Sequence, residues 1–123
     1  MAISLEASPK PLTDEQVHDY RARGWVVIPD VFSSAEVQTL GDAATEVLTR
    51  PGPEVGREDD GAPSICWGMH LFDERLEALV RHPDIVNPAK QLLENDIFVH
   101  QSRINMKQTN GSIVAWHQDF GTY

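Results

Sequence analysis

Apolar residues recur at helical spacing in the first half of the chain and predict two helices there. The first begins after Thr13, because Thr13 and Gln16 have the spacing of a capping box and acidic residues follow the cap. The second is capped by Ser33 or Ser34 and keeps its apolar positions at helical spacing as far as Arg50. Each helix is therefore expected to bury one face.

The stretches that follow the two helices predict short strands and shorter helices. Gly24 is a natural end for the first helix, and residues 25–28 form a β-branched run stopped by a proline, which predicts a strand. Residues 65–67 predict a second short strand. Residues 72–80 and 84–93 predict two short helices separated by a His-Pro pair. The chain thus mixes helices with strands.

Two stretches lack any periodic pattern. Residues 1–11 carry two prolines and are expected to form a loose N-terminal arm. Residues 50–63 are rich in proline, glycine and acidic side chains, and they predict a surface loop that is long for a mere connection. A solvated loop is favoured there over a lid beside a binding site.

The pattern changes to one of β-structure near the end of the chain. Residues 97–108 have β character, and Asn110-Gly111 is a strong hairpin signal, so residues 112–116 are expected to pair back as a second strand. The first of these strands alternates between a polar and an apolar face. The polar face either lines a pocket or is an exposed sheet surface. Its members are Gln101, Arg103, Asn105 and Lys107, and the apolar face holds Ile104 and Met106.

The strongest candidate for chemistry is the pair His117 and Asp119, which follows the second strand of the predicted hairpin. Side chains two positions apart project from one face of a strand, with Cα atoms roughly 6.5 to 7 Å apart. An imidazole nitrogen and a carboxylate oxygen can then converge on one metal ion. Two histidines and one carboxylate describe a non-haem Fe(II) oxygenase site, so a third ligand must come from elsewhere. The alternative is a strand end with two solvated polar residues.

Composition limits the classes of protein and partner. With 123 residues, 41% hydrophobic and 24% charged, the chain fits one globular domain. A formal net charge of −9 argues against nucleic acid or an anionic membrane as partner, and no apolar run reaches the length of a membrane span. The lone Cys66 excludes an internal disulfide, and with no signal peptide visible it favours a reducing, cytoplasmic setting.

Three ordered pieces of the sequence match the pattern of one known family: Leu12-Thr13-x-x-Gln16 leading to Gly24-Trp25-Val26-Val27-Ile28-Pro29, then His100-Gln101-Ser102-x-Ile104-Asn105-x-Lys107, then Trp116-His117-Gln118-Asp119-Phe120-Gly121-Thr122-Tyr123. On these residues the chain resembles the phytanoyl-CoA dioxygenase family, particularly its ectoine-hydroxylase-like and small-molecule-hydroxylase members. The resemblance extends over residues 12–123.

The resemblance implies an α+β fold, the N-terminal part of a double-stranded β-helix (jelly roll) with helices packed outside. In the family, the second ligating histidine and the arginine that pairs with 2-oxoglutarate lie well downstream of the His-x-Asp motif. A jelly roll also needs roughly eight strands, about twice the number predicted here. Residues 12–123 are therefore expected to be the N-terminal portion of a single jelly-roll domain, with the C-terminal half absent and no activity in the chain alone.

The resemblance also implies the chemistry. The family uses Fe(II), 2-oxoglutarate and O₂ to hydroxylate an unactivated C–H bond, with succinate and CO₂ as co-products. By resemblance, His117 and Asp119 are iron ligands, and Tyr123 lies on the side of the substrate, which is expected to be a small polar metabolite. Gln101, Asn105 and Lys107 fall where the family's strand lines the 2-oxoglutarate pocket.

Two other functions stay open at the level of sequence. One is a non-enzymatic jelly-roll module that binds metal or a partner, and the other is a cupin-like hydrolase or isomerase that uses another divalent metal. Unpaired strand edges would also leave the chain prone to self-association as a homo-oligomer.

Overall fold

The structure is a computed structural model that describes residues 11–107, 111, 113 and 115–118. Its elements follow the chain in this order: α1 (Asp14–Arg23), α2 (Ser34–Leu48), β1 (Val55–Arg57), β2 (Pro63–Trp67), the 3-10 helix η1 (Met69–Leu71), α3 (Glu74–Val80), α4 (Pro83–Leu93) and β3 (Arg103–Asn105). None of the helices in these ranges is long and apolar enough to cross a membrane.

The first two helices begin where the capping boxes predicted. The Thr13 side chain accepts a hydrogen bond from the backbone N–H of Gln16, whose own side chain bonds back to the backbone of Thr13. Ser33 and Glu36 form the same reciprocal pair at the start of α2. Gly24 ends α1 in the left-handed conformation, with φ of 82°, as a C-terminal glycine does. Both predicted helices are confirmed, but the buried face is found only on α2, because α1 contains no buried residue.

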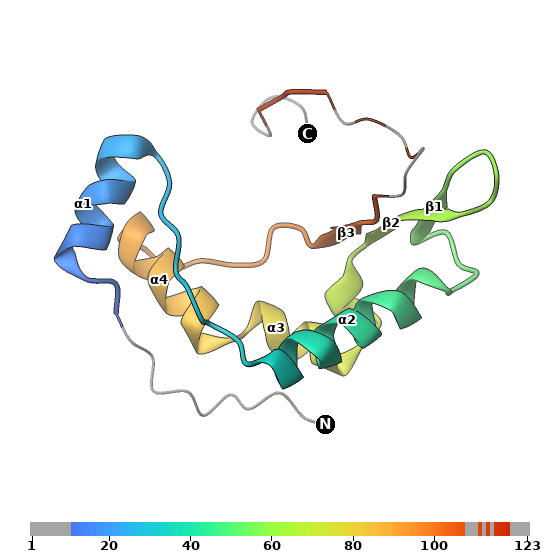
Figure 1. The fold of residues 1–123 in the computed structure, drawn as a ribbon, viewed down its shortest axis with the longest axis horizontal. Helices are drawn as coiled ribbons and strands as arrows, with labels where there is room; N and C mark the ends of the chain where they lie inside the picture. Colours follow the sequence, from blue (N-terminus) through green and yellow to red (C-terminus); the bar gives the residue numbers. More distant parts are fainter. Residues whose placement is uncertain (1–10, 108–110, 112, 114, 119–123) are drawn as a thin grey trace.

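A three-stranded antiparallel sheet lies beside α2, in the order β1-β2-β3 (Figure 1). Its helix-facing side carries Val55, Cys66 and Ile104, which align across the three strands. These side chains join Val47 and Leu48 of α2 in the hydrophobic core. The mixed helix and sheet architecture predicted from the sequence is thus confirmed.

The prediction of a surface loop over residues 50–63 is wrong in part, because this stretch contains β1. Glu58 N–H donates to the Ala62 carbonyl at 2.8 Å and closes a hairpin between β1 and β2. The pairing needs a residue without a side chain at Gly56, where an added Cβ would lie 2.5 Å from Ile65 Cγ2. The glycine, proline and acidic residues of this stretch therefore indicated the turn of a hairpin and not a loop along its whole length.

Two predicted strands are not strands in the structure. Residues 25–28 leave α1 without pairing to any described segment, so the β-branched run lacks a partner. The described members of the second hairpin strand, Ile113, Ala115 and Trp116, are also outside any strand, whereas Asn110 lies outside the described residues. Within residues 97–107, the described part of the stretch 97–108, only β3 is a strand. Residues 1–10 of the predicted arm lie outside the described residues as well.

His82 joins α4 to the segment that precedes α2. It is 2% exposed, and its Nδ1 accepts a hydrogen bond from the Asp84 backbone N–H at 3.3 Å, which caps α4. The imidazole meets the Phe32 ring edge-on, with centroids 5.0 Å apart. This histidine therefore has a structural role.

Candidate functional site

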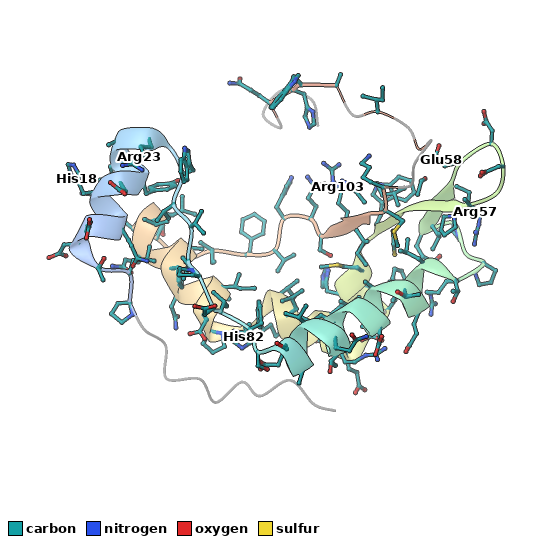
Figure 2. All side chains as sticks on the ribbon, viewed as in Figure 1. His18, Arg23, Arg57, Glu58, His82 and Arg103 are labelled. Carbon is teal, nitrogen blue, oxygen red and sulfur yellow. The ribbon has the colours of Figure 1, made fainter. Side chains whose placement is uncertain are left out.

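The face of the sheet opposite α2 carries the predicted polar row. Asn105 and Lys107 are exposed and Arg103 is half-buried, whereas Ile104 and Met106 pack against the core. Figure 2 shows the Arg103 side chain projecting away from α2. The alternation of polar and apolar faces is therefore confirmed. Gln101, which is also exposed, lies two residues before β3.

The register of the sheet adds an aromatic and an aliphatic side chain to this polar row. Trp67 is aligned with Arg103, and Ile65 is aligned with Asn105, on neighbouring strands. The Trp67 ring reaches across β1, because a Cβ at Gly56 would lie 2.9 Å from its Cη2 atom. Trp67 is 48% exposed. We call the set of Gly56, Ile65, Trp67, Arg103 and Asn105 the open face.

The open face combines an apolar floor with a cation and an amide. A guanidinium and an amide can bind a carboxylate, while an aromatic wall excludes water from it. The sequence placed Arg103 in the polar row without a role in binding, and it gave no indication of Trp67. The period-2 alternation already put Arg103 beside Asn105, but no local signal puts Trp67 there, because its position depends on pairing between distant strands.

The strand that carries Arg103 and Asn105 is fixed at both ends. Gly68 N–H donates to the Ser102 carbonyl at 2.7 Å, and Met106 N–H donates to the Ser64 carbonyl at 2.8 Å. His70 Nδ1 and the Ser102 hydroxyl are hydrogen-bonded at 2.5 Å. His70 therefore has a structural role, and these bonds hold the side chains of β3 in register on the open face.

His117 is the one predicted iron ligand among the described residues. It is exposed, and its Nδ1 lies 2.8 Å from the Ala115 carbonyl oxygen. A carbonyl oxygen only accepts hydrogen bonds, so Nδ1 carries the proton and the lone pair of the neutral ring is on Nε2. Metal-binding histidines commonly have this arrangement, with the non-ligating N–H bonded to a carbonyl.

The other predicted ligand, Asp119, and the predicted substrate residue, Tyr123, lie outside the described residues. Among residues that the structure does describe, no three His, Cys, Asp or Glu side chains are grouped so as to hold a metal ion. His117 therefore has the tautomer that a metal-binding histidine needs, with the proton on Nδ1. That His117 and Asp119 bind the same metal ion stays a prediction.

Cys66 is not suited to act as a nucleophile. It is fully buried in the core, and burial raises the pKa of its thiol above the ordinary value. A raised pKa lowers the thiolate fraction, which is the reactive form. Cys66 instead serves as a small buried member of the hydrophobic core.

Comparisons with known proteins give a consistent result. The family model described as phytanoyl-CoA dioxygenase (PhyH) matches residues 20–123. The chain is 38% identical over 112 residues to an L-proline trans-4-hydroxylase of Streptomyces griseoviridis, covering 89% of this chain and 41% of that protein. It is 35% identical over 119 residues to an ectoine dioxygenase of Bordetella bronchiseptica, covering 91% of this chain and 38% of that protein.

A third relative is named a probable alpha-ketoglutarate-dependent hypophosphite dioxygenase, from Stutzerimonas stutzeri. It is 28% identical over 120 residues, which cover 89% of this chain and 42% of the relative. The chain thus spans about two fifths of the length of the curated relatives it matches.

Proposed function

The chain belongs to the phytanoyl-CoA dioxygenase family, and we propose that it is part of an Fe(II)- and 2-oxoglutarate-dependent dioxygenase that hydroxylates a small metabolite. The observation that carries the proposal is the family match over residues 20–123. Relatives named for L-proline, ectoine and hypophosphite support a small substrate, and one is named as alpha-ketoglutarate-dependent. Succinate and CO₂ would be the co-products.

The fold is proposed to be part of a jelly roll. The sheet β1-β2-β3 would be one portion of it, with α2 and α3 packed outside. The rest of the domain would come from the portion that the relatives carry beyond the matched region. We also propose a cytoplasmic location, because the one cysteine is a buried thiol.

His117 and Asp119 would hold the iron. His117 fits this role because its Nδ1–H is engaged by the Ala115 carbonyl, which directs the lone pair to Nε2. The third ligand would come from the remainder of the family domain. When bound, the iron and 2-oxoglutarate supply the oxidising chemistry, and the protein orients the reactants and excludes water.

The residues of β3 and its flanks would bind 2-oxoglutarate. Lys107 and Arg103 supply positive charge, and Gln101 and Asn105 supply amides that can donate to carboxylate oxygens. Trp67, aligned with Arg103, would shield this contact from water. Tyr123 would form part of the substrate side. The backbone hydrogen bonds of the Ser102 carbonyl and the Met106 N–H would hold the polar side chains of β3 in one orientation before the cosubstrate binds.

A chimera tests the proposal. It carries residues 12–123 of this chain in place of the matched two fifths of the Streptomyces griseoviridis L-proline trans-4-hydroxylase. We expect it to form succinate from 2-oxoglutarate when Fe(II) and L-proline are present. His117→Ala should abolish this product, whereas His18→Ala, at an exposed histidine of α1, should not.

Three results would contradict the proposal. Wild-type succinate formation by the His117→Ala chimera would remove the ligand assignment. Metal-dependent turnover without 2-oxoglutarate would instead support the hydrolase or isomerase alternative. Loss of turnover in an otherwise folded chimera, with or without metal binding, would favour the non-enzymatic module.

A further inference from the structure

One side-chain hydrogen bond reaches the polar row from the core side of the sheet. His70 Nδ1 and the Ser102 hydroxyl lie 2.5 Å apart, and both residues are half-buried. Successive side chains of an extended segment point to opposite sides, so Ser102 shares the core side with Ile104. Its two neighbours, Gln101 and Arg103, point to the other side. His70 thus lies behind the open face and can act on it only through Ser102.

The turn at the end of β2 holds Ser102 by its backbone as well as by its side chain. Gly68 N–H donates to the Ser102 carbonyl at 2.7 Å, one position beyond the aligned pair of Trp67 and Arg103. Gly68 has a φ of 66°, a left-handed conformation that reverses the chain and that glycine adopts without strain. His70, two residues later, therefore returns beneath Ser102.

The hydrophobic core fixes the position of His70. Met69 and Phe72, which precede and follow it in η1 and its C-cap, both pack against the core. Leu71 N–H donates to the Gly68 carbonyl at 2.8 Å, and η1 as a whole packs against α3. The imidazole is thus held in place before any ligand binds, and it serves as a fixed point for Ser102.

The end of the polar row that includes Gln101 needs such a fixed point. Residues 96–102 lie in no helix or strand, and β3 begins at Arg103. Ser102 is the place where this irregular segment joins the sheet, through the bonds to Gly68 and His70. The ends of sheets open more readily than their centres, so the orientation of Gln101 and Arg103 depends on these two bonds.

We propose that His70 is a positioning residue for 2-oxoglutarate: its hydrogen bond with Ser102 fixes Gln101 and Arg103 in the orientation in which their amide and guanidinium groups meet the cosubstrate. The inference rests on the proposed function, because it takes the polar row as the 2-oxoglutarate site. A row that is already ordered binds its ligand without the entropic cost of ordering it. Loss of one net hydrogen bond corresponds to an affinity about two- to tenfold weaker.

Matched variants of the chimera test the role of the bond, with calorimetric titration of 2-oxoglutarate into the anaerobic Fe(II) form. His70→Asn keeps an amide where Nδ1 stands, able to donate or accept, whereas His70→Gln moves its amide out to the place of Nε2. The dissociation constant should rise about two- to tenfold in His70→Gln and in Ser102→Ala, and stay near wild type in His70→Asn. The double variant His70→Gln with Ser102→Ala should bind no more weakly than either single one. The kcat at saturating L-proline and 2-oxoglutarate should change by less than about twofold.

Hydrogen exchange in the 123-residue chain, followed by nuclear magnetic resonance without iron or 2-oxoglutarate, gives a readout independent of activity. The Gly68 amide bonds to Ser102 beside the His70 contact, and the Met106 amide bonds to Ser64 at the opposite end of β3. His70→Gln should speed exchange at Gly68 about two- to tenfold and leave Met106 unchanged. His70→Asn should change neither amide. A general loss of stability would instead speed exchange at both ends.

Each contrary outcome has a distinct meaning. Equal acceleration at Gly68 and Met106 overturns the positioning role and leaves His70 a contributor to stability alone. Wild-type affinity for 2-oxoglutarate in both His70→Gln and Ser102→Ala also overturns it, while the binding itself upholds the proposed function. A chimera with the wild-type residues that binds no 2-oxoglutarate contradicts the proposed function and removes the role of His70 with it. If the His70→Gln chimera does not fold, Ser102→Ala, which removes one hydroxyl and retains the imidazole, decides the question in the same way.

Discussion

Replacement of His82 is expected to destabilise the fold, although this residue lies outside the candidate site. His82→Ala removes the acceptor that caps α4, which is worth about 1 kcal/mol, and the edge-on contact with Phe32, worth about 0.5–1.5 kcal/mol. It also leaves a cavity, because the imidazole is 2% exposed. The sum is a loss of about 2–4 kcal/mol in the free energy of unfolding.

Two conservative variants separate the contributions. His82→Asn retains a cap acceptor and loses the ring, so it keeps the capping part of the stability. His82→Phe retains an aromatic contact with Phe32 and leaves the Asp84 N–H without its acceptor, at a cost of about 1–3 kcal/mol. His18→Ala, at an exposed site, should change stability by less than about 0.5 kcal/mol.

Urea unfolding at constant pH, followed by far-ultraviolet circular dichroism, measures these differences, and an unchanged slope with denaturant shows that the unfolding transition is comparable. If His82→Ala lies within about 0.5 kcal/mol of wild type, the buried cap and the aromatic contact do not hold α4 in place. If His82→Asn is as unstable as His82→Ala, the cap contributes nothing and the ring alone matters.

Three further outcomes are expected. In the chimera, Asn105→Ala or Lys107→Ala should raise the KM for 2-oxoglutarate more than the KM for L-proline, and equal effects in steady-state kinetics would return these residues to a merely exposed face. The hydrogen bond from Arg75 holds the pKa of Asp73 below its ordinary value, so the carboxylate adds stability above its unfolded pKa and loses it as pH falls through the folded pKa. Asp73→Asn should therefore flatten the acid side of the stability profile, and an unchanged profile would contradict this linkage. The 123-residue chain alone should form no succinate, because it brings two predicted iron ligands and not three; turnover by the monomeric chain would show that another residue, such as His100, completes the site.

Local patterns in the sequence determined the helices and the faces of β3. A capping box involves residues three positions apart, so Thr13 with Gln16 and Ser33 with Glu36 specify a helix start without reference to the rest of the chain. The alternation of Asn105 with Ile104 likewise follows from the period of a strand alone. The motif with His117 was equally visible, because it is contiguous and belongs to a family pattern.

Pairing between distant segments decided the rest. Residues 25–28 have the composition of a strand, but a strand exists only when another segment accepts its hydrogen bonds, and none of the described residues does so. The reverse holds for β1, where Gly56 has weak β propensity and lies in a proline-, glycine- and acid-rich stretch, yet the segment pairs because β2 lies alongside. Trp67 reaches the open face only through the register between β2 and β3. Local sequence patterns thus specified the features that depend only on neighbouring residues. The tertiary structure decided the contacts whose two partners lie far apart along the chain.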